Sequence, residues 1–168
     1  INNILYSSID TSTVIEGFTL TNGNISSDNG GGIQVLNGGL ILTSMNIINN
    51  KALNGIGGGL YIDDGTYSVI RNSSIKGNEA SASGGANIST DSVKVINCVI
   101  SSNRHSTSMN YTLAGGLSVF GHFFIDSTSF SNNYSYRYNG GGHFNGTGKL
   151  QNLTFDNNTS RHLTSAFR

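Results

Sequence analysis

Short alternations of apolar and polar residues recur along the chain, each directly after a pair of glycines. The alternation puts residues i and i+2 on one face, as a β-strand does. Typical runs are Ile33-Gln34-Val35, Leu60-Tyr61-Ile62 and Leu117-Ser118-Val119. The glycine pairs, spaced 27, 26, 31 and 26 residues apart, are Gly31-Gly32, Gly58-Gly59, Gly84-Gly85, Gly115-Gly116 and Gly141-Gly142. A repeat of this length predicts a solenoid.

Three further columns keep the same period. One apolar column is Ile15, Leu42, Ile70, Val95, Ile125 and Leu150, and a second, five residues later, is Leu20, Ile47, Ile75, Ile100, Phe130 and Phe155. Three residues after the second column stand Gly23, Asn50, Asn78, Asn103, Asn133 and Asn158. We interpret these asparagines as a structural ladder, because Asn can hydrogen-bond along a stack and tolerates left-handed backbone conformations in a tight turn. The glycine pairs fit a turn with positive φ or a close approach of two backbones.

Composition selects among the repeat architectures. Only 11% of the residues are charged, and Gly, Ser, Thr and Asn dominate, which argues against helical repeats. The Leu-x-x-Leu-x-Leu frame of leucine-rich repeats is absent. We therefore predict an all-β fold, a right-handed parallel β-helix (β-solenoid) of about six coils with three short strands each and no evident end caps. Residues 1-12 are expected to end a preceding coil, and the coils of this single domain lie near 13-38, 39-65, 66-91, 92-121, 122-147 and 148-168.

Charge and hydropathy exclude some partners. The formal net charge is zero, so no basic surface recommends nucleic acid. There is no apolar run near the roughly 20 residues of a membrane-spanning helix. Cys98 is the only cysteine and shares a column with Phe18, Met45 and Leu153, which predicts a packed thiol. Because the chain begins at Ile1 and shows no capping element, we expect a processed or excerpted chain, or copies that stack end to end.

Glycosylation signals are dense. The pattern Asn-x-Ser/Thr occurs at Asn24, Asn72, Asn87, Asn110, Asn133, Asn145, Asn152, Asn157 and Asn158. Asn133 and Asn158 belong to the ladder, and a chain this rich in Asn, Ser and Thr also produces such patterns by chance. The best candidates are Asn24, Asn87 and Asn110, with Asn87 expected to point outward between Ala86 and Ile88. An extracellular or cell-surface location follows as an expectation.

The repeats resemble the pectin-lyase-like parallel β-helix superfamily over essentially the whole chain. Gly84-Gly85-Ala86, with Phe130-Ser131-Asn132-Asn133 and Phe155-Asp156-Asn157-Asn158, is similar to the Gly-Gly-Ala and Phe-x-x-Asn repeats of chlamydial polymorphic membrane proteins. That second resemblance implies a surface-displayed adhesin. Only one glycine pair is followed by Ala, and only two residues of the second apolar column are Phe.

The superfamily resemblance also implies where an active site would lie. Its lyases use a calcium-binding acidic cluster and a basic residue, and its hydrolases use two or three Asp in adjacent coils. The candidates here are Asp63, Asp64 and Asp91, which follow the glycine-pair strand in consecutive coils and would form a Ca²⁺ site; simple turn formation is the alternative. No other cofactor is expected.

The histidines and aromatics are weighed separately. His105, His122, His143 and His162 fall in different registers, so we expect neither a metal cluster nor a proton relay from them. His143 is assigned to the inward slot of Ile33, Leu60, Ala86 and Leu117. Outward contacts are predicted for Tyr61, Tyr134, Tyr136, Tyr138 and Phe144, which either stack on sugars or proteins or cover the base of a loop.

The sequence therefore favours an extracellular structural or adhesive β-helical protein, glycosylated and a candidate subunit of a head-to-tail fibril. We expect no enzymatic activity, no nucleic-acid partner and no membrane span. The alternative is a carbohydrate-active enzyme, a polysaccharide lyase or glycoside hydrolase, with Asp63, Asp64 and Asp91 as its candidate residues.

Overall fold

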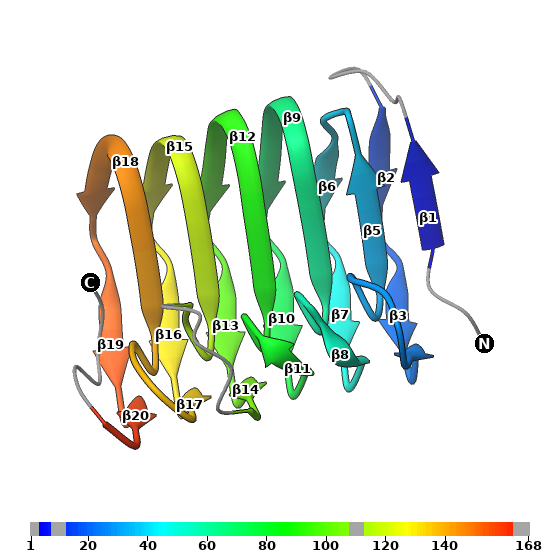
Figure 1. Cartoon of the computed structure of the whole chain (residues 1–168). Helices are drawn as coiled ribbons and strands as arrows, with labels where there is room; N and C mark the ends of the chain where they lie inside the picture. The colour runs from blue at the N-terminus through cyan, green and yellow to red at the C-terminus, as the bar shows by residue number, and fades with distance from the viewer. Residues whose placement is uncertain (1–3, 8–12, 108–112, 163–168) are drawn as a thin grey trace.

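The structure is a computed structural model that describes residues 4–7, 13–107 and 113–162. These residues form three parallel sheets that are stacked coil upon coil (Figure 1). The first sheet contains β1 (Ile4–Ser7), β5 (Ile33–Leu36), β9 (Leu60–Arg71), β12 (Ala86–Ile96), β15 (Leu117–Asp126) and β18 (Gly142–Gln151), together with β2 (Val14–Glu16) and β6 (Ile41–Thr43). The described part is all-β, and the predicted parallel β-solenoid is confirmed.

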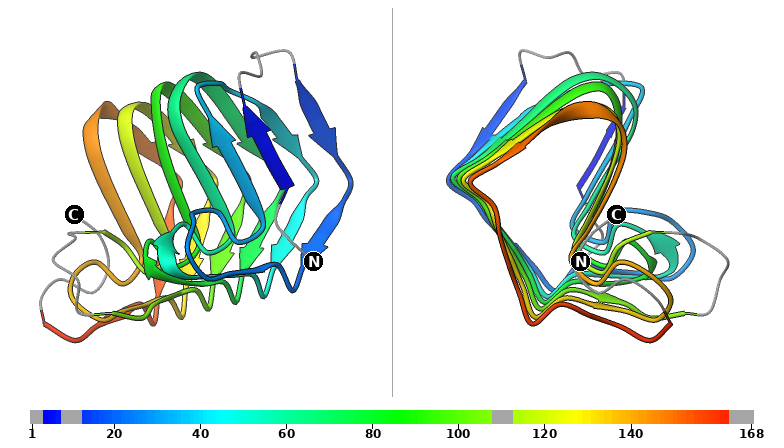
Figure 2. Two further views of the ribbon diagram at one scale, coloured as in Figure 1. Left: turned by 45° about the vertical axis from the view of Figure 1, so that its right-hand side comes forward. Right: turned by 90° about the vertical axis from the view of Figure 1, so that its left-hand side faces the viewer.

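The other two sheets take one short strand from each coil. The second sheet contains β3 (Thr19–Thr21), β7 (Asn46–Ile48), β10 (Ser74–Lys76), β13 (Val99–Ser101), β16 (Ser129–Ser131) and β19 (Thr154–Asp156). The third contains β4 (Asn24–Ile25), β8 (Lys51–Ile56), β11 (Glu79–Ala82), β14 (Arg104–His105), β17 (Tyr134–Ser135) and β20 (Thr159–Ser160). Seen along the stack, the coils superpose, and the connections after the third sheet project from one side (Figure 2).

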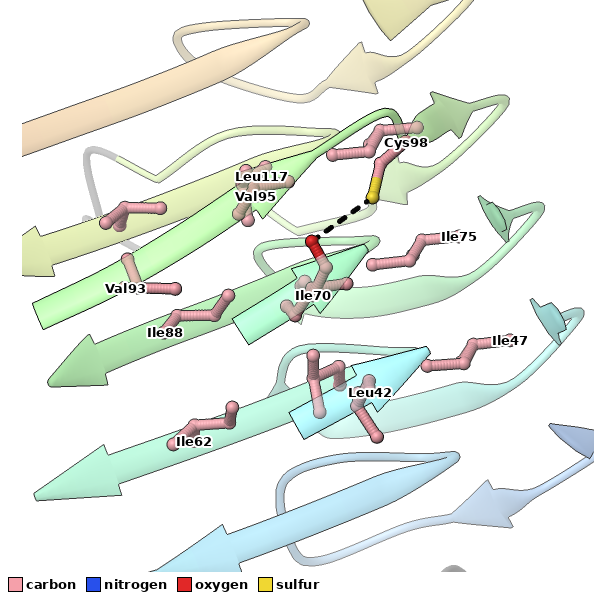
Figure 3. Packing of buried hydrophobic residues seen from close by; sticks show 14 of the residues in the cluster. Leu42, Ile47, Ile62, Ile70, Ile75, Ile88, Val93, Val95, Cys98 and Leu117 are labelled. Carbon is pink, nitrogen blue, oxygen red and sulfur yellow. Dashed lines mark hydrogen bonds between the residues drawn. The ribbon is translucent and has the colours of Figure 1, made fainter. Parts of the chain in front are cut away.

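Both predicted apolar columns are correct in register. Leu20 pairs with Ile47, and the column continues through Ile75 and Ile100 to Phe130 and Phe155. The other column runs from Ile15 through Leu42, Ile70, Val95 and Ile125 to Leu150. Their side chains fill the tube between the sheets (Figure 3). The rings of Phe130 and Phe155 stack with centroids 4.7 Å apart, so each coil packs on its equivalent in the next.

Cys98 shows how position along the stack decides burial. Its thiol is 2% exposed, donates to the Ile96 carbonyl at 3.3 Å, and lies 3.6 Å from the Ile70 carbonyl (Figure 3). Burial raises the pKa of the Cys98 thiol to about 11. The predicted packed thiol is therefore confirmed. Phe18 lies in the same column but is 59% exposed, because no described coil packs below it.

The corners of the coil depend on left-handed residues. One corner has positive φ at Ser44, Asn72, Asn97, Ser127 and Asn152, and the next has it at Asn22, Asn49, Ser102, Asn132 and Asn157. Asn is among the few non-glycine residues that adopt this conformation readily. The second set lies one position before the ladder asparagines. The left-handed turn that we assigned to the ladder residues is therefore made by their neighbours.

The last glycine pair is shifted by one residue from its predicted position. The amide of Leu117 donates to Gly141, and Leu117 pairs with Gly142, so Gly140-Gly141 is the equivalent pair. Three consecutive glycines, Gly140 to Gly142, allow two frames, and the predicted pair Gly141-Gly142 is one residue too late. As a result His143 pairs with Ser118 in the outward row, and Phe144 pairs with Val119 and packs against the core. The inward position predicted for His143 and the outward one predicted for Phe144 are both wrong.

Candidate functional site

The ladder asparagines lie at the corner between the second and third sheets. Asn103 is representative: its Oδ1 accepts from the backbone amide of Asn78 at 3.0 Å and from Asn78 Nδ2 at 3.1 Å. Its Nδ2 donates to the Ile75 carbonyl at 2.9 Å and to Asn133 Oδ1 at 3.0 Å. The same links recur at Asn50, Asn78, Asn133 and Asn158. Each side chain therefore ties together successive coils.

The glycine pairs lie against this ladder. A Cβ added at Gly85 would be 2.4 Å from the Gly116 oxygen and 2.9 Å from Asn103 Cγ, and Gly59 stands in the same relation to Asn78. The pairs thus provide a close approach of backbones, and positive φ falls instead on the preceding Gly30 and Gly57. Gly23 fills the first rung because a Cβ there would lie 2.0 Å from the Gly31 oxygen.

A row of outward residues follows the glycine pairs and lies beneath the projecting loops. Its register equivalents are Gln34, Tyr61, Asn87, Ser118 and His143. Ser118 Oγ accepts from the Ala114 amide at 2.9 Å and from Ser83 Oγ at 2.8 Å. Burial, and then the neighbouring Asp63, raise the pKa of the Tyr61 hydroxyl. Most of this row is buried although it lies outside the tube.

Two of the three favoured glycosylation candidates can be placed. Asn24 is exposed, whereas Asn87 is only 6% exposed and donates from Nδ2 to Ser83 Oγ at 3.2 Å. The expectation that Asn87 is accessible is therefore wrong, because the loop covers an outward-pointing side chain. Asn110 lies outside the described residues. Among the remaining acceptors, exposed side chains are found at Asn72, Asn145, Asn152 and Asn157.

The three aspartates do not come together. Asp64 and Asp91 line one shallow pocket of about 310 Å³ with Phe120, at the bend between the two halves of β9, β12 and β15. Asp63 instead hydrogen-bonds the Tyr61 side chain. Within residues 4–7, 13–107 and 113–162, no group of three or more His, Cys, Asp or Glu could hold a metal ion. The prediction that adjacent coils bring Asp64 and Asp91 together is correct. Asp63 points elsewhere, because successive side chains of a strand alternate between its two faces.

The four histidines lie apart: His105 in β14 of the third sheet, His122 at the bend of β15, His143 in the outward row and His162 shortly after β20. His105 is fully buried, with Nδ1 3.1 Å from Ser135 Oγ. Burial lowers the pKa of His105, and the charge of Arg137 lowers it further. His122 Nδ1 lies 2.6 Å from Thr147 Oγ1 on the exposed bend. His162 packs beside the Tyr136 ring, 6.1 Å between centroids.

The predicted tyrosines form a surface with arginines on the third sheet. Arg104 lies 4.7 Å from the centroid of Tyr134, Arg161 lies 4.8 Å from that of Tyr136, and Arg137 lies 5.7 Å from that of Tyr138. We call this set the tyrosine–arginine face. Sequence reasoning found the tyrosines and missed the arginines. The position within the repeat could have revealed them. Arg104 occupies the position of Tyr134 one coil earlier, and Arg161 occupies the position of Tyr136 one coil later.

The face joins a charged row on the same sheet. Lys51 Nζ lies 3.3 Å from Glu79 Oε2, and Arg104 Nε lies 3.8 Å from Glu79 Oε1. Such exposed pairs contribute at most about 1 kcal/mol each to stability. Their effect here is to fix the position of Arg104 between a carboxylate on one side and a tyrosine ring on the other.

Comparisons with known proteins add no further identification. No protein-family model matches the chain, and no curated protein or solved structure matches it. Over the residues that the structure describes, no helix is long and apolar enough to cross a membrane.

Proposed function

We propose that the chain is an extracellular structural or adhesive β-solenoid. The observation that carries this proposal is the tyrosine–arginine face, in which exposed Arg104 and Arg161 lie beside partly exposed tyrosines. The face is built on a scaffold whose coils are hydrogen-bonded to one another by the asparagine ladder. Aromatic and arginine side chains are the residues most enriched at the centres of protein-binding surfaces. A repetitive stack that holds such a surface in place is suited to adhesion.

The scaffold supports the structural half of the proposal. The ladder bonds run in series, so displacing one coil from its neighbour would break side-chain and strand hydrogen bonds together. Solenoid stability of this kind is a sum of similar interfaces between neighbouring repeats. The expected property is stiffness along the axis.

The extracellular half rests on the acceptor pattern at Asn24 and at other exposed asparagines. A direct test is antibody labelling of intact and permeabilised cells that produce the protein, with glycosidase treatment of the purified material. We expect labelling of intact cells, and an Asn24→Gln variant that loses one glycan. Labelling only after permeabilisation would contradict the proposal.

End-to-end association is a further part of this proposal. Among the described residues, strands β3, β4, β19 and β20 each have one partner in their sheet, and we propose that a like strand of a second copy adds there. Electron microscopy of the purified protein at increasing concentration tests this. We expect filaments about one coil stack wide, and discrete particles at every concentration would exclude self-assembly by this route.

The alternative, a carbohydrate-active enzyme, is favoured by the pocket that Asp64 and Asp91 share with Phe120. Two carboxylates and an aromatic ring are the residue types that glycoside hydrolysis uses. Incubation with uronate and neutral polysaccharides, with and without calcium, tests it. Cleavage that is lost in both Asp64→Asn and Asp91→Asn would replace the adhesive proposal with the enzymatic one, whereas intact polymers in every condition would remove the alternative.

A further inference from the structure

We propose that the tyrosine–arginine face binds an acidic polysaccharide, one that carries carboxylate or sulfate groups. This inference deepens the adhesive function and rests on it in naming the class of ligand. Three successive coils form this face, at β14, β17 and β20.

The face combines the tyrosines of one coil with arginines of the coil before and the coil after. Tyr134, in β17, and Tyr136, directly after it, flank the buried Ser135, so alternation puts both rings on the outer side of the sheet. Arg104 reaches Tyr134 from the preceding coil, and Arg161 reaches Tyr136 from the following one. A guanidinium therefore stands on each side of the tyrosine pair, at positions that the strand register fixes.

The guanidinium groups keep donors for an anion. Each guanidinium carries five N–H donors, of which Arg104 turns its Nε toward Glu79 and Arg161 gives one nitrogen to the Tyr136 hydroxyl. The remaining donors match a carboxylate or sulfate, which accepts two parallel hydrogen bonds. The bond to the Tyr136 hydroxyl also fixes the plane of the Arg161 group. Because the arginines are held in place before binding, less side-chain entropy is lost when the anion arrives.

Local charge favours an anionic ligand. The described segments 104–107, 134–138 and 159–162 contain three arginines and no Asp or Glu, and the buried His105, with its lowered pKa, is not counted as a charge. Arg104 is paired with one carboxylate, that of Glu79, and Glu79 is also paired with Lys51. The chain as a whole has no net charge, so the positive character is a property of this face.

A sugar polymer fits better than a nucleic acid. Nucleic-acid affinity grows with each phosphate that is neutralised, and this face offers only three arginines on a chain of zero net charge. The tyrosines offer instead what a sugar needs: flat apolar rings with a polar edge. A chain of uronate or sulfated sugars presents apolar sugar faces alternating with negative groups. Tyrosine rings can contact the faces, and arginines can contact the negative groups.

The test is binding of purified full-length protein to polygalacturonate and chondroitin sulfate at about 50 mM salt, with dextran as the neutral polymer and single-stranded DNA as the competing polyanion. We expect binding to both acidic polysaccharides that weakens as salt is raised, and no binding to dextran. The double variant Arg104→Gln/Arg161→Gln should bind at least about tenfold more weakly, because each lost arginine removes a charge-assisted contact.

Two further variants separate charge from geometry. Lys149→Gln removes one positive charge from the first sheet, where the side chain is exposed, and should leave binding within about twofold of wild type. Tyr136→Leu keeps an apolar side chain but removes the ring, and should weaken binding although the net charge is unchanged. Circular dichroism and thermal unfolding establish that each variant is folded.

Three results would overturn the inference. These are no binding of either acidic polysaccharide by the folded protein, equal loss in Lys149→Gln and in the double arginine variant, or tighter binding of single-stranded DNA than of the polysaccharides. Because the assay uses purified protein, its failure would leave cell-surface labelling intact. Failure of cell-surface labelling would in turn leave the binding result intact, so the two proposals fail separately.

Discussion

The solenoid satisfies its buried polar groups in two different ways at two places. At the ladder corner, formed by Asn50, Asn78, Asn103, Asn133 and Asn158, five successive coils repeat one hydrogen-bond pattern with one residue type. On the loop side, formed by the outward row Gln34, Tyr61, Asn87, Ser118 and His143, every coil uses a different residue with its own partner. The repeated asparagine bonds hold the coils together, whereas the polar contacts under the loops differ from coil to coil.

The difference has an energetic consequence. A ladder residue bonds to the coil before and the coil after, so its loss leaves buried groups without partners at two levels. A loop-side residue bonds mainly within its own coil and loop, so its loss is confined there. We therefore expect stability to depend more steeply on the ladder corner than on the loop side.

The largest effect is expected for Asn103→Ala. The change removes four hydrogen bonds, leaves the buried amide of Asn78 without its acceptor, and takes one of its donors from the Ile75 carbonyl. At about 1 kcal/mol for each bond, the free energy of unfolding should fall by about 4 kcal/mol. Urea unfolding followed by circular dichroism measures it.

The matched control is Asn97→Ala at the other corner. Asn97 is exposed and makes one side-chain bond, to Asn72 Oδ1 at 2.8 Å, from a left-handed backbone position. Strain at positive φ should make this change cost about 1 kcal/mol. Equal losses for the two asparagines would refute the special role of the ladder.

Gly85→Ala should rank second. Its Cβ would lie 2.4 Å from the Gly116 oxygen and would press on the Asn103 side chain, so backbone must move and about 3 kcal/mol should be lost. Gly17→Ala is the comparison, because a Cβ there meets nothing within 4 Å and only its positive φ of 77° is strained. We expect about 1 kcal/mol for Gly17. A larger loss at Gly17 than at Gly85 would show that conformation matters more than close approach.

On the loop side, Ser118→Ala should cost less. The Ala114 amide and Ser83 Oγ lose one partner, which predicts a loss of about 1–2 kcal/mol. Limited proteolysis should find cleavage near residues 113–116 accelerated while the ladder corner stays protected. Accelerated cleavage at the ladder corner as well would mean that the two regions unfold together.

The smallest effect is expected for the pH dependence of stability that comes from His105, in β14 of the third sheet. Burial holds the pKa of the folded-state imidazole below its ordinary value, so the unfolded chain binds the proton more readily. Stability from this group is complete above the unfolded pKa of about 6.5 and is lost as pH falls from there toward the lowered folded value. The melting temperature should therefore drop between pH 7.5 and 5.5, and His105→Gln should reduce that drop. An unchanged drop in the variant would assign it to other groups.

The repeated columns are where sequence reasoning succeeded. The apolar columns and the in-phase asparagines follow from one period, because each coil must place the same residue types at the same depth. The fold class was therefore predictable without any structural template. The glycine pairs were also visible, but their contact with the ladder was not, since it joins positions that lie far apart within a coil.

The errors fall where the period is locally ambiguous or a loop intervenes. The triplet Gly140-Gly141-Gly142 allowed a one-residue slip, which moved His143 and Phe144 to the wrong faces. Asn87 was correctly read as pointing away from the tube, yet a variable loop buries it. The arginines of the tyrosine–arginine face have no period of their own, so only the register of the strands brings them to the tyrosines.

Hydrogen exchange of the backbone amides tests most directly that the ladder corner is the rigid part of the molecule. The amides of Asn78 and Asn103 donate to side-chain oxygens rather than to a strand. We predict that they exchange as slowly as the amides inside β9 and β12, and more slowly than Ala114 on the loop side. Exchange of Asn78 and Asn103 at the rate of Ala114 or faster would contradict the account.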